Sequence, residues 1–223
     1  MTYILNIETS TTNCSVSLAK DGKNVLILED NSENYSHAER LHVFIQELFE
    51  KTGVSKSELA AVAVSKGPGS YTGLRIGVST AKGICYALNI PLIAVSTLKV
   101  LAVQVENSEG LIIPMLDARR MEVYSTAFDS ELNEVREIQA EVLDENSFSN
   151  YLTQGPVYFI GNGVQKTKTV IKHSNAHFIE GKMPSAREMA ALSFKEYKIG
   201  NTEDVAYFEP YYLKDFIALK PKP

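Results

Sequence analysis

The sequence predicts an α/β protein of two lobes, each built on a β-β-β-α-β-α unit. Each half of the 223-residue chain opens with three short β-rich runs and then alternates helical patterns with further strands, an order that favours a sheet covered by helices. Each half also ends its first strand with a carboxylate, Glu8 in one and Asp117 in the other. This correspondence indicates a duplication, so we expect one lobe over residues 1–105 and a second over residues 106–223.

Three strands joined by short polar turns begin the first half. The second turn contains Asp21-Gly22, a pair typical of β-hairpins. A helix begins at Ser36, because Ser36 and Glu39 have the spacing of a capping box and apolar residues follow at helical intervals. The expected elements of this half are strands at 3–7, 14–19 and 24–28, a helix at 36–51, a strand at 60–64, a helix ending near residue 88, a strand at 91–95 and a short helix from residue 96.

The second half repeats this order. Its expected elements are strands at 111–116, 121–128 and 135–141, a helix at 144–152, a strand at 157–160, and helices at 163–172 and 185–197. Ser185 is expected to cap the last helix, with Glu188 at the box position. Residues 173–177 are interpreted as a turn.

The composition of the chain indicates which partners and which cellular compartment to expect. The net charge is −5 and the basic residues are dispersed, so any contact with nucleic acid is expected to need a partner. Cys14 and Cys85 are the only cysteines, too few for a disulfide framework or a zinc cluster. The sequence begins without a basic leader and apolar core, and no run has the length of a membrane span. We therefore expect a cytoplasmic protein that does not contact membranes.

A glycine-rich turn from Gly67 to Gly73 leads from a strand into the next helix. A phosphate loop would end in Gly-Lys followed by Ser or Thr, but this chain has Leu74-Arg75 there. Ser70 does not lie in the Gly-x-Ser-x-Gly pattern of a nucleophile elbow. We therefore expect Ser70 or Thr72 to cap the helix.

The helix after this turn carries a ridge of small residues. Gly73, Gly77 and Ala81 recur at every fourth position, so they share one face. One interpretation is that a helix of a partner approaches this face closely, and the other is that the helix packs tightly on its own sheet. On the first interpretation, Gly77→Leu is expected to weaken association more than folding.

Three segments carry a resemblance to a known family: Ile7-Glu8-Thr9-Ser10, residues 66–83 and residues 114–124, supported by Tyr212-Leu213-Lys214-Asp215. With these motifs the chain resembles the bacterial TsaB (YeaZ) family over nearly its whole length. The resemblance implies a two-lobed actin-like ATPase fold, also called the ASKHA or ribonuclease H-like fold. It further implies a non-catalytic subunit that associates with the catalytic paralogue TsaD and the ATPase TsaE. That machinery installs N6-threonylcarbamoyladenosine at adenosine 37 of tRNAs reading codons that begin with A.

The resemblance also implies a partner interface on the two helices of the first half. The same surface would serve a homodimer when the chain is alone and the heterodimer with TsaD, and tRNA would be reached through the complex. The implied interface residues are Leu41, Ile45, Thr72, Gly73, Ile76, Gly77, Thr80 and Ala81. The aromatic segment 207–212 is either a further contact toward TsaE or a tail packed on the second lobe.

The resemblance implies no catalytic residue and no metal site in this chain. The paralogue binds its catalytic metal with a histidine cluster, whereas the matching segment here, residues 96–101, contains no histidine. His173 and His177 are four residues apart but flank an expected turn. Candidate cofactor-binding residues are Glu8, Thr9, Ser10 and Asp117. No cofactor is predicted, a nucleotide at a subunit interface stays open, and the alternative function is a stand-alone ATP-dependent enzyme or metallopeptidase of the same fold.

Overall fold

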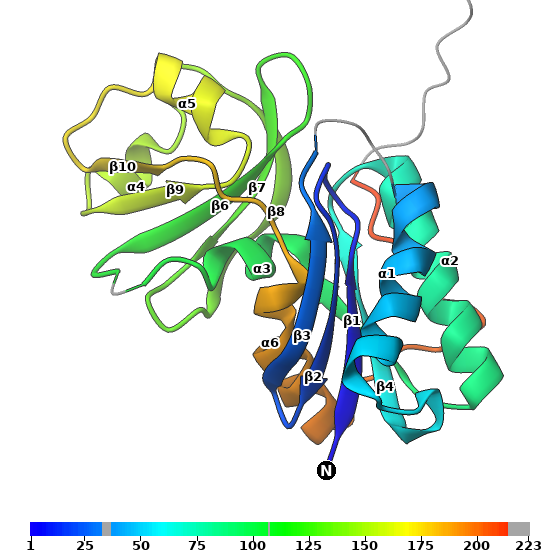
Figure 1. Cartoon of the computed structure of the whole chain (residues 1–223). Coiled ribbons are helices and arrows are strands. Elements are labelled where there is room, and N and C mark those ends of the chain that lie inside the picture. The colour runs from blue at the N-terminus through cyan, green and yellow to red at the C-terminus, as the bar shows by residue number, and fades with distance from the viewer. Residues whose placement is uncertain (33–36, 107, 214–223) are drawn as a thin grey trace, which may run out of the picture.

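The computed structural model describes residues 1–32, 37–106 and 108–213 of the chain (Figure 1). The expected capping residue Ser36 therefore lies outside the described residues. Within them the chain forms two five-stranded sheets, each with parallel and antiparallel pairs. The predicted α/β architecture of two lobes is confirmed. None of the helices in this part of the chain combines the length and the apolar character that crossing a membrane requires.

The first sheet has the strand order β3-β2-β1-β4-β5. Its strands are β1 (Tyr3–Glu8), β2 (Cys14–Lys20), β3 (Lys23–Asp30), β4 (Leu59–Gly67) and β5 (Leu92–Ser96). The first three form an antiparallel meander, and the turn at Asp21-Gly22 connects β2 to β3 as expected. β4 pairs in parallel with β1, and β5 pairs in parallel with β4. The carboxyl ends of β1, β4 and β5 therefore lie at the same edge of the sheet.

Two long helices cover one face of this sheet. They are α1 (His37–Thr52) and α2 (Tyr71–Leu88), which Figure 1 shows side by side. α1 packs on β2 and β3, and α2 packs on β4 and β1. α1 buries Leu41 and Leu48 against the sheet because its apolar residues recur every three to four positions. A short 3-10 turn, η1 (Lys56–Glu58), connects α1 to β4 and was not predicted.

The ends of α2 show why this helix begins and stops where it does. Ser70 caps it, because its hydroxyl accepts a hydrogen bond from the N–H of Gly73 at 3.3 Å. Of the two expected caps, Ser70 and Thr72, the structure assigns the role to Ser70. The helix ends at Asn89, which adopts the left-handed conformation common at helix C-termini.

The second sheet repeats the first. Its strands are β6 (Leu111–Asp117), β7 (Glu122–Phe128), β8 (Glu134–Val142), β9 (Val157–Ile160) and β10 (Ala176–Ile179). Their order, β10-β9-β6-β7-β8, is that of the first sheet when each strand is matched to its counterpart. The predicted duplication is therefore confirmed. The expected turn at 173–177 stops earlier, because residues 176–179 pair in parallel with β9 as a short edge strand.

The helices of the second lobe are shorter than expected. They are α4 (Ser149–Leu152) and α5 (Val164–Val170). The helix expected over 144–152 begins late because Asp144 forms a turn, in which its carboxylate accepts hydrogen bonds from the N–H of Asn146 and the hydroxyl of Ser147. Such local bonds from Asp and Ser compete with helix formation.

Each lobe is completed by a helix from the other half of the sequence. α3 (Thr97–Ala102) packs Leu98 and Leu101 against strands of the second sheet. α6 (Ala186–Lys198) packs Ala186 and Met189 against the free face of the first sheet, and Figure 1 shows it beside β2 and β3. The expected division at residue 105 separates the two sheets, but the first lobe also takes in α6.

Candidate partner-binding surface

The ridge formed by Gly73, Gly77 and Ala81 faces the inside of the chain. A Cβ atom on Gly73 would collide with the backbone oxygen of Thr9, and a Cβ atom on Gly77 would collide with the Thr9 hydroxyl. That hydroxyl donates a hydrogen bond of 2.8 Å to the carbonyl oxygen of Gly73, and Ala81 is fully buried. The glycines thus let α2 pack tightly on the end of β1, as the internal-packing interpretation predicts. We expected Gly77→Leu to weaken association more than folding, but the collision with Thr9 places its main effect on folding.

A second row of small residues lies on the exposed side of α2. Thr72, Ser79 and Gly83 are exposed, and Ile76 is half-buried between them. A Cβ atom on Gly83 would meet no atom within 4 Å, so nothing inside the chain requires glycine there. Glycine in a helix interior costs about 1 kcal/mol relative to alanine. A residue that weakens the helix without an internal reason indicates an external one, such as close approach by another molecule.

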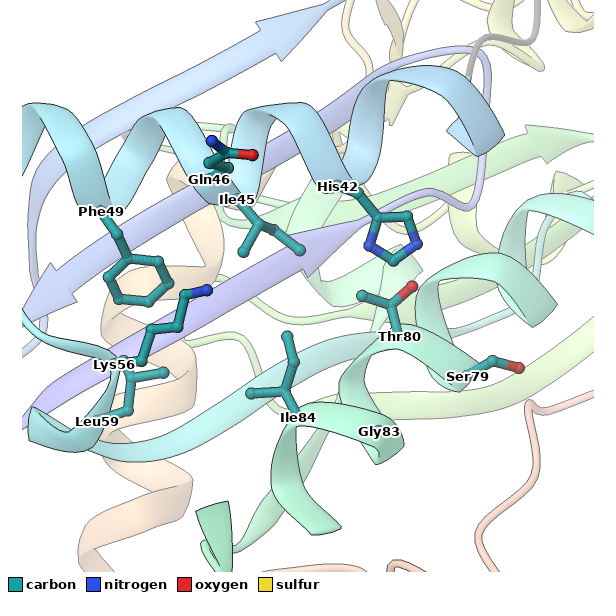
Figure 2. A pocket seen from close by; sticks show the side chains of 10 residues that line it. All are labelled: His42, Ile45, Gln46, Phe49, Lys56, Leu59, Ser79, Thr80, Gly83 and Ile84. Atoms are coloured by element: carbon teal, nitrogen blue, oxygen red, sulfur yellow. The ribbon is translucent and has the colours of Figure 1, made fainter. Parts of the chain in front are cut away.

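An apolar groove of about 560 Å³ separates α1 from α2. Figure 2 shows Ile45 and Phe49 pointing from α1 toward Ile84 on α2. Polar side chains from the two helices, including His42 and Thr80, stand along the groove. Its full lining consists of His42, Ile45, Gln46, Phe49, Lys56, Leu59, Ser79, Thr80, Gly83 and Ile84. An apolar floor with a polar rim is typical of protein interfaces.

The predicted interface residues divide into three groups. Leu41, Gly73, Gly77 and Ala81 are buried inside the chain. Ile45 and Thr80 meet in the groove. Thr72 and Ile76 lie on the exposed row of α2. The accessible part of the prediction is therefore the groove together with the row, which we name the α1–α2 surface and define by Ile45, Phe49, Thr72, Ile76, Ser79, Thr80, Gly83 and Ile84.

Sequence reasoning missed several members of this surface. Phe49 lies four residues after Ile45, so helical spacing places them on one face. Gly83 continues no apolar pattern, and its position inside a long helix was the available signal. Ser79 and Ile84 carried no signal that distinguishes a groove from an ordinary helix flank.

The C-terminal segment covers the other flank of α2. The Lys82 ammonium donates hydrogen bonds to the carbonyl oxygens of Ala206 at 3.1 Å and Phe208 at 2.9 Å. Tyr212 packs on Tyr71 with ring centroids 5.0 Å apart. Of the two alternatives for residues 207–212, packing on the second lobe is wrong, because this segment lies along α2 of the first lobe.

A guanidinium group joins the two tyrosines at the start of α2. Arg75 lies 4.2 Å from the centroid of the Tyr71 ring, and its Nε donates to the Tyr212 hydroxyl at 3.3 Å. Cation–π contacts of this kind are worth about 0.5–1 kcal/mol at exposed sites. One flank of α2 faces α1, and the C-terminal segment covers the other flank. The exposed row of α2 lies between these flanks and is accessible to solvent.

The candidate nucleotide-binding residues of the first lobe are used inside the protein. Glu8, Thr9 and Ser10 are buried. The N–H of Ser70 donates to the Ser10 carbonyl at 2.7 Å, and a Cβ atom on Gly69 would collide with the same carbonyl oxygen. The turn before α2 therefore closes over the loop in which an anion would have to bind.

The other candidate ligands are Asp117, His173 and His177, and they do not form one site. Asp117 is exposed and forms an ion pair of 3.1 Å with Lys166. His177 lies in β10, where its ring stacks on Tyr158 with centroids 5.0 Å apart, while His173 lies before the turn. Within the described ranges, no group of three His, Cys, Asp or Glu side chains is placed to bind a metal ion.

Glu8 is a fully buried carboxyl group at the end of β1. One of its oxygens accepts a hydrogen bond of 2.6 Å from the N–H of Ser10, and the other has no hydrogen-bond partner among the described residues. Burial raises the pKa of Glu8 above 4.5, and the hydrogen bond from Ser10 opposes that shift only in part. The folded state therefore favours the protonated, uncharged form of this side chain.

Glu8→Gln should stabilise the protein near neutral pH. Because the folded-state pKa is raised, the wild-type protein has the full benefit of protonated Glu8 only below about pH 4.5 and loses it as the pH rises through the folded pKa. The amide stays uncharged, so its melting temperature should exceed that of the wild type at pH 7.5, with the difference vanishing near pH 4. Thermal melts across this range measure the effect. The exposed residue Glu137 provides the control Glu137→Gln, and equal pH profiles for both variants would contradict the assignment.

Comparisons with known proteins agree with this architecture. The family model "TsaD: tRNA N6-adenosine threonylcarbamoyltransferase" matches residues 31–221. The tRNA threonylcarbamoyladenosine biosynthesis protein TsaB of Escherichia coli (strain K12) is 31% identical over 229 residues, which cover 99% of this chain and 98% of that protein. The tRNA N6-adenosine threonylcarbamoyltransferase of Bacillus subtilis (strain 168) is 33% identical over 108 residues, which cover 42% of this chain and 31% of that protein.

A solved structure shares the whole fold. YeaZ from Pseudomonas aeruginosa superposes with a TM-score of 0.81 at 26% identity, covering 96% of this chain and 100% of that chain. The match to TsaB extends over both chains, whereas the match to the transferase covers less than half of either. The chain therefore has the two-lobed actin-like fold and belongs to the TsaB (YeaZ) family.

Proposed function

We propose that this chain is a non-catalytic subunit of the machinery that makes N6-threonylcarbamoyladenosine at adenosine 37 of tRNAs reading codons that begin with A. In this role it binds and activates the catalytic paralogue TsaD. The observation that carries the proposal is the α1–α2 surface, where an apolar groove lies beside a glycine that has no packing role inside the chain. The names of its relatives supply the pathway.

The geometry of the α1–α2 surface supports a partner that presents helices. Two helices from each subunit would form a four-helix contact, with axes near the short end of the usual range of about 8–10 Å where Ser79 and Gly83 lie. Apolar side chains of the partner would fill the groove between Ile45 and Ile84. A second copy of the chain and TsaD would compete for this surface, so the homodimer is the form adopted when TsaD is absent.

A supporting role, rather than catalysis, agrees with how the candidate cofactor-binding residues are used. The Thr9 hydroxyl donates to Gly73, and the Ser10 carbonyl accepts from Ser70. The Thr9 proton is therefore not available to a phosphate, and Glu8, Thr9 and Ser10 are all buried. No nucleotide is assigned to this chain alone. The proposed site of action is the cytoplasm, where the buried thiols of Cys14 and Cys85 would stay reduced. The ATPase TsaE is the proposed third component.

Reconstituted transfer of the threonylcarbamoyl group to tRNA tests this function. TsaD and TsaE are supplied with threonylcarbamoyl-adenylate and unmodified tRNA, with the chain present or absent. Sustained turnover should require the chain, because the proposed activation acts through TsaD. Equal turnover without it would overturn the proposal. A titration of the isolated chain with ATP and magnesium then distinguishes a stand-alone ATP-dependent enzyme, which would bind the nucleotide without a partner.

A further inference from the structure

Two arginines form the tip of the β6–β7 hairpin. Arg119 and Arg120 are both exposed, and their φ angles are 70° and 49°. This left-handed region is unfavourable for residues with a Cβ atom, and turns that need it select asparagine and glycine. The backbone of the hairpin would therefore be better served by Asn-Gly. The guanidinium groups need a reason other than the turn itself.

The base of this hairpin is fixed by hydrogen bonds. Lys166 on α5 donates from its ammonium to the carbonyl oxygens of Arg120 at 2.8 Å and Glu122 at 2.7 Å. The Asp117 carboxylate accepts from the N–H of Arg119 at 2.6 Å, and the N–H of Asp117 donates to Asn162 at 2.8 Å. The tip is thus held on a rigid support, which keeps the ordering cost of binding low.

The charges at the tip are not balanced by neighbours. The carboxylate of Asp117 forms its ion pair with Lys166. Neither Arg119 nor Arg120 has an ion pair or a hydrogen bond from its side chain within the described residues. The basic residues of the hairpin and its support are Arg119, Arg120 and Lys166, and the acidic residues counted with them are Asp117 and Glu122. These five side chains together carry a net positive charge.

We propose that the arginine tip binds the sugar–phosphate backbone of the substrate RNA, with the guanidinium groups of Arg119 and Arg120 contacting neighbouring phosphates. This inference rests on the proposed function, which makes tRNA the substrate. A guanidinium group presents two parallel N–H donors that match a phosphate. An exposed hairpin tip can contact the phosphates on the outside of an RNA without the protein forming a binding groove. The tip and the α1–α2 surface lie on different lobes (Figure 1).

The paired substitution Arg119→Asn with Arg120→Gly tests the tip without endangering the fold. Asparagine and glycine tolerate positive φ, so this variant should fold at least as well as the wild type. In the reconstituted complex its KM for tRNA should rise while kcat stays unchanged. Fluorescence anisotropy measures direct binding of the full chain to unmodified tRNA, and the wild type should bind more tightly than the Asn-Gly variant. Because the variant lacks two phosphate contacts, the ratio of the two affinities should fall about tenfold between 50 and 200 mM salt.

Two control variants separate the site from general charge. Arg119→Lys with Arg120→Lys keeps both charges and should keep most of the salt dependence, while losing the paired donors. Lys195→Gln with Lys198→Gln removes two exposed positive charges from α6. This second variant should bind tRNA as the wild type does.

Three results would overturn the inference. The first is an unchanged KM and salt dependence for the Asn-Gly variant in a complex that the wild-type chain activates, which would leave the proposed function intact. The second is an equal loss of tRNA binding in the α6 variant, because net charge would then explain the effect. The third is a loss of binding to TsaD or TsaE with tRNA binding unaffected, which would assign the tip to a protein partner. If the wild-type chain activates no transfer, the proposed function fails, and the anisotropy measurements decide the inference by themselves.

Discussion

Gly73→Ala should destabilise the first lobe severely. Its Cβ atom would overlap the backbone oxygen of Thr9, and neither α2 nor the end of β1 can shift freely because Thr9 and Gly73 are joined by a buried hydrogen bond. Overpacking of this kind typically costs about 1–3 kcal/mol, and the backbone contact places Gly73 at the upper end. For a chain of this length we expect the melting temperature to fall by roughly 6–12 °C. Thermal unfolding followed by circular dichroism measures the change.

Gly83→Ala is the matched control for this prediction. It makes the same substitution in the same helix, but its Cβ atom would meet nothing within 4 Å. Alanine favours the helix by up to about 1 kcal/mol, so the melting temperature should rise slightly. If the variants at positions 73 and 83 changed stability in the same direction, tight packing of α2 on β1 would not explain the inward glycines.

Gly83→Leu should weaken partner binding while leaving the fold intact. The side chain would project from the exposed row of α2 into the space that the proposed partner helix would occupy. Displacing that helix costs about 1–3 kcal/mol, or roughly a tenfold to hundredfold loss of affinity. Leucine is a good helix former, so thermal stability at low protein concentration should not fall. Analytical ultracentrifugation measures the homodimer, and isothermal titration with TsaD measures the heterodimer.

Ala191→Leu supplies a control on another face of the molecule. Ala191 is exposed on α6, which packs on the opposite face of the first sheet from α2. The variant adds a similar apolar side chain and should leave both associations unchanged. Normal association of the Gly83 variant, or an equal defect in the Ala191 variant, would remove the α1–α2 surface as the partner site. Transfer activity should follow association in every variant.

The strands and long helices could be predicted because their local patterns are strong. Three β-rich runs opened each half, apolar spacing marked α1 and α2, and the capping residues Ser185 and Glu188 marked α6. β10 was missed because a four-residue edge strand contains too few positions to show a period. α4 was predicted too long because Asp144 can form either a helix start or a turn. Such choices depend on packing partners that are distant in sequence.

The interface prediction shows what spacing can and cannot give. Repetition at every fourth residue correctly placed Gly73, Gly77 and Ala81 on one face of a helix. It could not determine which side of that face the sheet would occupy, because small residues suit a core contact and a subunit contact equally. Only the position of Thr9 against the two glycines showed that they face inward. The accessible surface of α2 is instead the exposed row, which lies on a different face of the helix from Gly73 and Gly77.

The exchange of α3 and α6 between the lobes has a consequence for biosynthesis. The inner face of the first sheet is covered by α6, which is anchored by hydrogen bonds of 2.8 Å between Ala186 and the hydroxyls of Ser15 and Ser17. Some 170 residues separate these groups in sequence, so a ribosome must translate most of the chain before that face is covered. The amino-terminal half therefore cannot mature ahead of the rest during translation. Until the last helix emerges, the apolar face that α6 covers stays exposed, and exposed apolar surface makes folding intermediates prone to aggregate.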